Sequence, residues 1–224
     1  GVDLKGITTL QSMQDADFLR KIRDDHSISK AVIIGGGLIG IETCEALQLA
    51  GMEITVIELL PQLLTFLDWD LAKLVENHVR AKNANVITGN GIAAFLGENG
   101  KLTGVKLANG TELPCELAVI AIGVTPNVKL ARASGLQIGE TGGIAVNEYM
   151  QTSNPRIYAA GDVAMEYKFT HAAAAAAKIV IQNALFYGRK KITALKLPWC
   201  TYTDPEIAHV GLYEHDANAK GIRI

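Results

Sequence analysis

Short apolar runs, bounded by glycine, proline and charged residues, punctuate the first half of the chain. Four of these runs have the length and composition of buried parallel strands, and they lie at residues 31–34, 54–57, 85–88 and 117–122. Between the first two runs, apolar residues recur at helical spacing from residue 39 to residue 50, and Gly51 is suited to end that helix. Residues 31–58 therefore predict one complete β-α-β unit.

Two more helices and a set of hairpins are predicted in the same half. Residues 13–25 indicate a short surface helix with Ser12 as its N-cap, and residues 68–82 indicate an amphipathic helix. Residues 92–113 alternate between apolar and polar side chains and contain turn sequences that favour antiparallel hairpins, Glu98-Asn99-Gly100 and Asn109-Gly110. The fold class that we expect is α/β, with a Rossmann-like doubly wound parallel sheet and an inserted antiparallel β-meander.

The second half of the chain has fewer clear elements. Residues 142–146 and 157–160 predict two further strands. An alanine-rich stretch predicts a long helix over residues 171–187, because alanine has the highest helix propensity. Residues 197–210 predict an edge segment or linker followed by a strand.

Three glycines, Gly35, Gly37 and Gly40, follow the first strand in G-x-G-x-x-G spacing. Gly35 allows a tight turn, Gly37 lets a pyrophosphate approach the backbone, and Gly40 lets the helix pack closely on the sheet. Leu38 and Ile39 lie at the helix N-terminus, where unpaired N–H groups and a partial positive charge favour phosphate binding. A turn without a ligand is the alternative, but the order strand, turn, helix, strand and acid favours a dinucleotide site.

The acid of that series is Glu58, directly after the second strand. Its carboxylate can accept hydrogen bonds from a ribose diol and would repel a 2′-phosphate. No Lys or Arg occurs from Glu58 to Asp70 to bind such a phosphate. The sequence therefore predicts NAD(H) rather than NADP(H).

Composition excludes several classes of protein. The chain has 224 residues, 49% of them hydrophobic, and a net charge of −2 with no basic stretch beyond residues 189–191, which disfavours nucleic-acid binding. No apolar run reaches 18 residues, so no membrane span is expected. Cys44, Cys115 and Cys200 form no close pair in the sequence, and we expect reduced thiols in a cytoplasmic protein. No metal site is predicted.

Four segments, in this order, resemble the two-dinucleotide flavoprotein disulfide reductases, the pyridine nucleotide-disulfide oxidoreductases. They are GGGLIGIE (35–42), VIAIGVTPN (119–127), IYAAGDVA (157–164) and YTDPEIAHVG (202–211). The stretches KFTHAAAAAAKIVIQNALF (168–186) and PWCTYTDPE (198–206) are most similar to the branch of mercuric reductase and lipoamide dehydrogenase.

The resemblance implies FAD beside NAD as a cofactor, and it implies roles for matching residues. Glu42 resembles the family's acid beside the nicotinamide and the flavin, and we take it as the candidate catalytic residue. Gly123 lies in the loop that lines the NAD site. Asp162 resembles the acid that binds the FAD ribityl chain. Thr170 and His171 begin the helix whose N-terminus faces the flavin, and for His171 only the backbone position is required.

The family also has an N-terminal FAD glycine fingerprint with a C-x-x-x-x-C pair and a C-terminal His-Glu pair, which this sequence lacks. The resemblance therefore implies an internal segment of a longer, homodimeric protein. We expect a connector with a short helix (1–27), an NAD(H)-binding domain (28–127), the C-terminal segment of a split FAD-binding domain (128–196) and the start of the dimer-interface domain (197–224).

The expected function follows from these roles. The chain would be the NADH-binding part of an FAD-dependent oxidoreductase, which passes hydride from NADH to flavin and electrons on to a disulfide or similar acceptor. One alternative is a relative without a redox disulfide, such as an NADH oxidase or a ferredoxin or nitrite reductase. A second alternative, of another class, is a non-catalytic dinucleotide-binding module.

Overall fold

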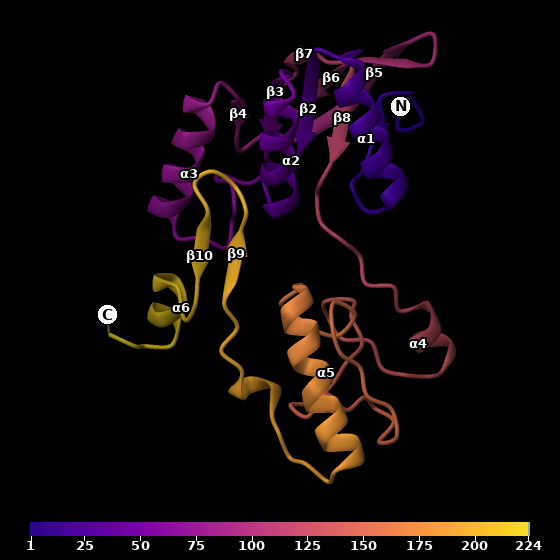
Figure 1. Ribbon diagram of the computed structural model, residues 1–224, viewed down its shortest axis with the longest axis vertical. Coiled ribbons are helices and arrows are strands. Elements are labelled where there is room, and N and C mark those ends of the chain that lie inside the picture. Colours follow the sequence, from indigo (N-terminus) through magenta and orange to yellow (C-terminus); the bar gives the residue numbers. More distant parts are fainter. Residues whose placement is uncertain (224) are drawn as a thin grey trace. The chain divides into compact units, whose positions relative to one another are not determined.

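A parallel β-sheet lies at the centre of the first part of the chain in the computed structural model, which describes residues 1–223 (Figure 1). The strand order in this part is β1-β8-β2-β3-β4, and all neighbouring strands are parallel. The strands are β1 (Ile7–Thr8), β2 (Lys30–Ile34), β3 (Glu53–Ile57), β4 (Asn85–Ile87) and β8 (Leu117–Ile120). All four predicted strands are confirmed, although the fourth ends two residues earlier than expected.

The order of the strands fixes where a ligand can bind. From β2 the chain crosses to β3 on one side, whereas β8 lies on the other side of β2. Ile34 at the end of β2 is in register with Ile57 of β3 and with Ile120 of β8, so the three carboxyl ends lie together. Such a change of direction creates the crevice in which doubly wound sheets bind nucleotides.

Helices cover one face of this sheet. Helix α2 (Leu38–Leu49) packs against β2 and β3, and α3 (Trp69–Ala81) packs against β4. Helix α1 (Met13–Asp25) has the predicted bounds, and Ser12 caps it through a capping box with Asp15. These three helices confirm the helices that the apolar periodicity of the sequence predicts.

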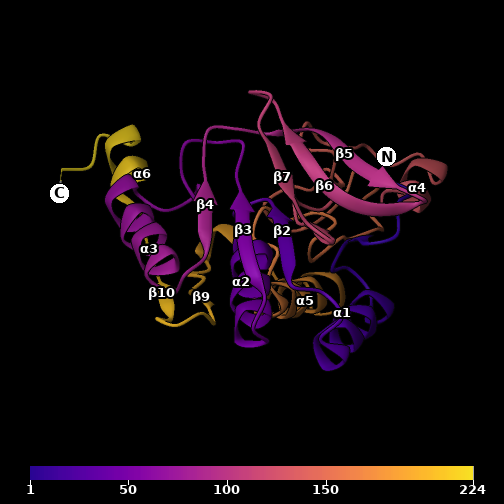
Figure 2. The same ribbon diagram turned by 90° about the horizontal axis from the view of Figure 1, so that it is seen from above.

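An antiparallel meander covers the opposite face (Figure 2). It consists of β5 (Ile92–Glu98), β6 (Lys101–Leu107) and β7 (Glu112–Pro114), and its turns lie at the predicted Asn-Gly sequences. Val105 and Leu107 of the meander are buried with Val32 of β2 in one apolar cluster. The meander therefore takes the place of the helices that cover the second face in an ordinary doubly wound fold.

The chain divides into two compact units. The first comprises residues Gly1–Gly123, Thr201–Ile207 and the segment that begins at Leu212, and the second comprises Val124–Cys200 and Ala208–Gly211. The second unit contains α4 (Lys129–Ala133), α5 (Thr170–Leu185) and the short 3₁₀ helix η1 (Ile192–Ala194). Its buried core consists of Met150 together with Ala176 and Ile179 of α5.

The two strands predicted for this unit do not form. The amides of Ile144 and Ala145 donate to the carbonyls of Val163 and Gln137, at 2.7 and 3.0 Å, so consecutive residues bond to different segments. Each segment makes one isolated bridge, between Ile144 and Ile138 and between Tyr158 and Gln151. A ladder needs one continuous neighbouring strand, and no such strand lies beside these residues within the described part of the unit.

Three short elements follow the second unit's helices. Strands β9 (Trp199–Thr201) and β10 (Ile207–His209) pair with each other, which confirms a strand in this region, and α6 (Glu214–Ala219) was not predicted. Asp68 anchors α6 by accepting hydrogen bonds from the amides of Glu214 and His215, at 3.0 and 3.3 Å. Residue 224, the last of the predicted interface segment, lies outside the described residues.

Candidate dinucleotide-binding site

Two glycines of the fingerprint are required by the fold itself. Gly35 has φ +109°, and a Cβ there would lie 2.3 Å from the carbonyl oxygen of Ala121. A Cβ on Gly40 would lie 1.9 Å from the carbonyl oxygen of Gly35 and 3.4 Å from Ile33 Cγ2. Gly35 therefore makes the sharp turn out of β2, and Gly40 brings α2 against the sheet, as predicted.

Gly37 is different, because neither its backbone conformation nor its packing against the protein requires a glycine. Its φ of −79° suits any residue, and a Cβ would meet no protein atom within 4 Å. Gly37 is also the N-cap of α2, yet no side chain caps this helix. An open position at an uncapped helix N-terminus, with Leu38 and Ile39 in the first turn, fits a bound pyrophosphate.

Glu58 lies beside this turn, and its carboxylate is fixed by two backbone amides. Oε2 accepts a hydrogen bond from Gly36 N at 2.7 Å, and Oε1 accepts one from Leu60 N at 2.8 Å. A carboxylate oxygen has two lone-pair sites, so each oxygen can still accept a hydrogen bond from a ribose hydroxyl. The negative charge is thus held next to the helix N-terminus in one orientation.

Sequence reasoning did not assign a role to Gly36. A Cβ there would lie 2.4 Å from Leu63 Cδ2 and 3.3 Å from Glu58 Cβ. A side chain at this position would displace the side chain of Leu63 and would crowd that of Glu58. The sequence did offer an indication of this role, because Gly36 lies between two of the fingerprint glycines.

Gly123 follows β8, on the other side of the crevice from Glu58. It has φ +111°, and a Cβ would meet no protein atom within 4 Å. The strain of this backbone favours glycine, and the open space leaves room for a ligand. A dinucleotide whose adenosine lies near Glu58 can extend past Gly37 towards this loop.

Glu42 lies one turn into α2 and is half-buried. Its Oε1 accepts two hydrogen bonds, from Thr201 Oγ1 and from Tyr202 N, both at 3.1 Å. No predicted contact involved these two residues, because 159 and 160 positions separate them from Glu42. The candidate catalytic carboxylate is therefore held by the last residue of β9 and the residue that follows it.

Two cysteines of the first unit, Cys44 and Cys115, do not have the character of a redox nucleophile. Both are free thiols, and both are buried. Burial raises the pKa of the Cys44 thiol to about 12, with a further contribution from the charge of Glu45, and burial raises the pKa of Cys115 to about 11. Both are protonated at neutral pH and therefore unreactive.

In the second unit, Asp162 lies on the surface at the edge of a cavity of about 350 Å³. Gly161, with φ +81°, turns the chain so that the amides of Ala164 and Met165 bond to its carbonyl. Lys168, which was not predicted, lines the same cavity and supplies a positive charge. The cavity thus presents one acid and one base at the position that the resemblance assigns to FAD.

Thr170 and His171 form the first turn of α5, which no side chain caps. His171 Nε2 donates to the carbonyl of Pro198 at 2.6 Å, and its ring stacks on Phe169 at 5.5 Å between centroids. The imidazole is therefore occupied by a structural contact, and the free amides are the groups that this turn offers to an anion.

The predicted residues fall into two groups, one in each unit. The β2–α2 turn gathers the residues assigned to NAD(H) in the first unit, while those assigned to FAD belong to the second. Among residues 1–223, no cluster of three or more His, Cys, Asp or Glu could hold a metal ion. No helix in that range is long and apolar enough to cross a membrane.

Comparison with known proteins gives consistent results. The family model for pyridine nucleotide-disulphide oxidoreductases matches residues 1–177. A mercuric reductase of Staphylococcus aureus is 34% identical over 197 residues, which cover 86% of this chain and 36% of that protein. An NADH oxidase of Methanocaldococcus jannaschii is 30% identical over 235 residues, which cover 100% of this chain and 52% of that protein.

A solved structure supports the fold over almost the whole chain. The NAD-dependent persulfide reductase from A. fulgidus superimposes with a TM-score of 0.87 at 34% identity, over 98% of this chain and 42% of that one. The chain thus spans between 36% and 52% of the length of these three proteins. Their names share a reductase or oxidase activity but differ in the electron acceptor.

Proposed function

Because the chain belongs to the pyridine nucleotide-disulphide oxidoreductase family, we propose that it is the NADH-binding part of an FAD-dependent oxidoreductase. One observation carries the proposal. At Gly37, a glycine that the fold does not require lies at an uncapped helix N-terminus, beside a carboxylate fixed by two amides. This arrangement suits the pyrophosphate and the adenosine ribose of NADH.

Each residue then has one task. The α2 amides bind the pyrophosphate, Glu58 accepts the ribose hydroxyls, and Gly123 leaves room for the nicotinamide end. Glu42 lies on the nicotinamide side and fixes the orientation of that ring. Asp162 and the first turn of α5 bind FAD. NADH supplies the hydride that the flavin accepts, and the protein supplies position and charge.

The acceptor that we propose is a disulfide or a similar sulfur species. The persulfide reductase supports this choice, as does an NAD(P)H coenzyme A polysulfide/persulfide reductase of Pyrococcus horikoshii, whereas the NADH oxidase supports transfer to oxygen as the second candidate. We also propose a homodimer for the complete protein, on the resemblance of residues 197–224 to the start of an interface domain.

The choice of NADH over NADPH tests the proposal. The 224-residue chain should bind NADH at least about tenfold more tightly than NADPH, because Glu58 would face the 2′-phosphate, and tenfold corresponds to about 1.4 kcal/mol. Glu58→Ala should weaken NADH binding by about 1.5–3 kcal/mol, the range for hydrogen bonds to a charged group. Fluorescence titration of the reduced nicotinamide measures both affinities.

Glu58→Gln separates charge from geometry. It keeps one carbonyl oxygen as an acceptor and removes the negative charge, so it should reduce the preference for NADH more than it weakens NADH binding. Tighter binding of NADPH than of NADH by the unmodified chain would contradict the proposal. An NADH affinity unchanged by Glu58→Ala would remove Glu58 from the site.

A further inference from the structure

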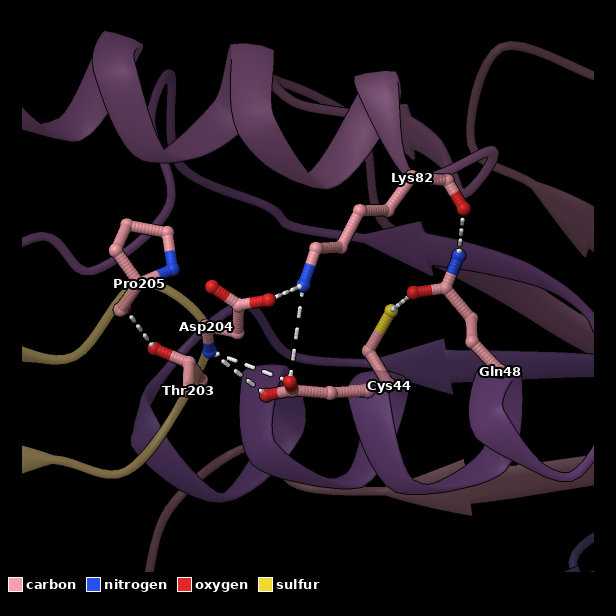
Figure 3. Close-up of polar contacts among 7 residues, drawn as sticks. Cys44, Gln48, Lys82, Thr203, Asp204 and Pro205 are labelled. Carbon is pink, nitrogen blue, oxygen red and sulfur yellow. Dashed lines mark hydrogen bonds and ion pairs between the residues drawn. The ribbon is translucent and has the colours of Figure 1, made fainter.

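An ion pair fixes the segment after β9 to the helices of the first unit (Figure 3). Lys82, at the C-terminal end of α3, places its Nζ 2.5 Å from Asp204 Oδ2 and 3.9 Å from Glu45 Oε1. The hydrogen bond from Lys82 lowers the pKa of Asp204 from its ordinary value. Two carboxylates from different segments therefore share one ammonium group.

Helix α2 holds both partners of this ion pair. Glu45 accepts hydrogen bonds from Asp204 N, with 3.2 Å to each of its oxygens. Gln48, one turn further along α2, donates from Nε2 to the carbonyl of Lys82 at 2.9 Å (Figure 3). Lys82 is thus fixed through its backbone as well as its side chain.

Glu42 lies on the same helix face as Glu45, because residues three apart are neighbours on a helix. The segment that bonds to Glu45 through Asp204 N bonds to Glu42 through Thr201 and Tyr202. Residues 201–204 therefore follow α2 for one turn, with the ion pair at one end and the Glu42 carboxylate at the other.

We propose that Lys82 is a positioning residue, whose ion pair with Asp204 clamps residues 201–204 along α2 and so fixes the orientation of the Glu42 carboxylate. The inference rests on the proposed function only for the placement of Glu42 at the nicotinamide end of NADH. Side chains at the ion pair are partly exposed, 34% for Lys82 and 72% for Asp204, so its contribution to global stability is small. The ion pair instead acts locally, on the position of residues 201–204.

Lys82→Met in the 224-residue chain tests the clamp. The variant removes the charge and keeps an unbranched side chain of similar length. Amide hydrogen exchange at Tyr202 and Asp204 should become about threefold to fivefold faster, because local opening then costs less by the small amount that an exposed ion pair contributes. Lys82→Arg should restore slow exchange at both amides, since a guanidinium can bind the same two carboxylates.

A second readout concerns NADH itself. Saturation transfer from the chain to the nicotinamide C4 protons, divided by transfer to the adenine C2 proton, reports how the nicotinamide end is held. This ratio should fall at least about twofold in Lys82→Met, while the NADH dissociation constant changes less than about twofold, because the pyrophosphate and ribose contacts remain.

Lys73→Met is the matched control. Lys73 lies on α3 as well and is 31% exposed, but its partner is Glu76 of the same helix, at 2.6 Å. This variant also loses one lysine and one ion pair, yet no contact with residues 201–204 is lost. Both the exchange rates and the saturation ratio should match those of the unmodified chain.

The outcomes separate the clamp from the proposed function. Unchanged exchange at Tyr202 in Lys82→Met overturns the inference, and so does faster exchange with an unchanged saturation ratio if Glu42→Gln lowers that ratio. Faster exchange together with a lower ratio, both restored by Lys82→Arg, supports it. A ratio that Glu42→Gln leaves unchanged contradicts the placement of Glu42 in the proposed function, and the exchange rates alone then decide the clamp.

Discussion

Gly37→Asp should remove most of the affinity for NADH without loss of stability. Aspartate is among the preferred N-cap residues, and its charge is favourable at a helix N-terminus, so the free energy of unfolding should rise by roughly 0–1 kcal/mol. The same carboxylate would bind the α2 amides in place of the pyrophosphate and would repel it. We expect at least about a hundredfold weaker NADH binding, or about 2.8 kcal/mol.

The opposite signs of the two effects make this variant informative. Urea denaturation measures stability, and nicotinamide fluorescence measures binding. Gly37→Asn is the control, because it caps the helix with a side chain of the same size but carries no charge, and it should weaken binding less than Gly37→Asp. NADH affinity that Gly37→Asp leaves unchanged would show that the β2–α2 turn does not bind the pyrophosphate.

Gly40→Ala should destabilise the first unit by more than about 3 kcal/mol. The new Cβ would lie 1.9 Å from the carbonyl oxygen of Gly35, and neither backbone can move without separating α2 from the sheet. Overpacking of a core costs about 1–3 kcal/mol when side chains can yield, and here the contact is with backbone. The gain in helix propensity, about 1 kcal/mol, is too small to compensate.

Gly37→Ala is the matched control for this substitution. It adds the same methyl group three residues earlier, where no protein atom lies within 4 Å. Loss of the better N-cap should cost only about 1 kcal/mol. If urea denaturation gave Gly40→Ala the same stability as Gly37→Ala, α2 would not pack on β2 as closely as the structure indicates.

The first unit could be predicted because its signals are local. The β-α-β unit, the helix bounds at 13–25 and the Asn-Gly turns of the meander each follow from neighbouring residues, whose periodicity and turn chemistry need no distant partner. Strand β1 was missed for the opposite reason. It has only two residues, and it exists because Ile7 and Thr8 pair with β8 more than 100 positions away.

In the second unit, an apolar pattern predicted strands that do not form. Residues 142–146 and 157–160 have the composition of buried strands, but a pattern cannot say whether a neighbouring strand is present. Their apolar side chains instead contribute to the cluster around Met150 and α5, as Val146 and Ala160 do. The conformation of these two segments is therefore determined by side-chain packing rather than by a ladder of hydrogen bonds.

The candidate site was predictable to a different extent at each residue. Gly35, Gly40 and Glu58 lie within one short motif, and the structure places them together. The contacts of Glu42 were invisible in the sequence, because Thr201 and Tyr202 reach it only through the tertiary fold. The motif YTDPE was noticed for its resemblance, while its contact with α2 depends on the ion pair of Lys82.

The most direct test of the account is a map of where NADH binds on the unmodified chain. Amide chemical shifts recorded during a titration with NADH should change at residues 36–41, at Glu58 and Leu60, and at Gly123, because these backbone groups surround the carboxyl end of β2. Saturable changes confined to these residues would support the dinucleotide site. Changes confined to the second unit, or no saturable change at millimolar NADH, would contradict it.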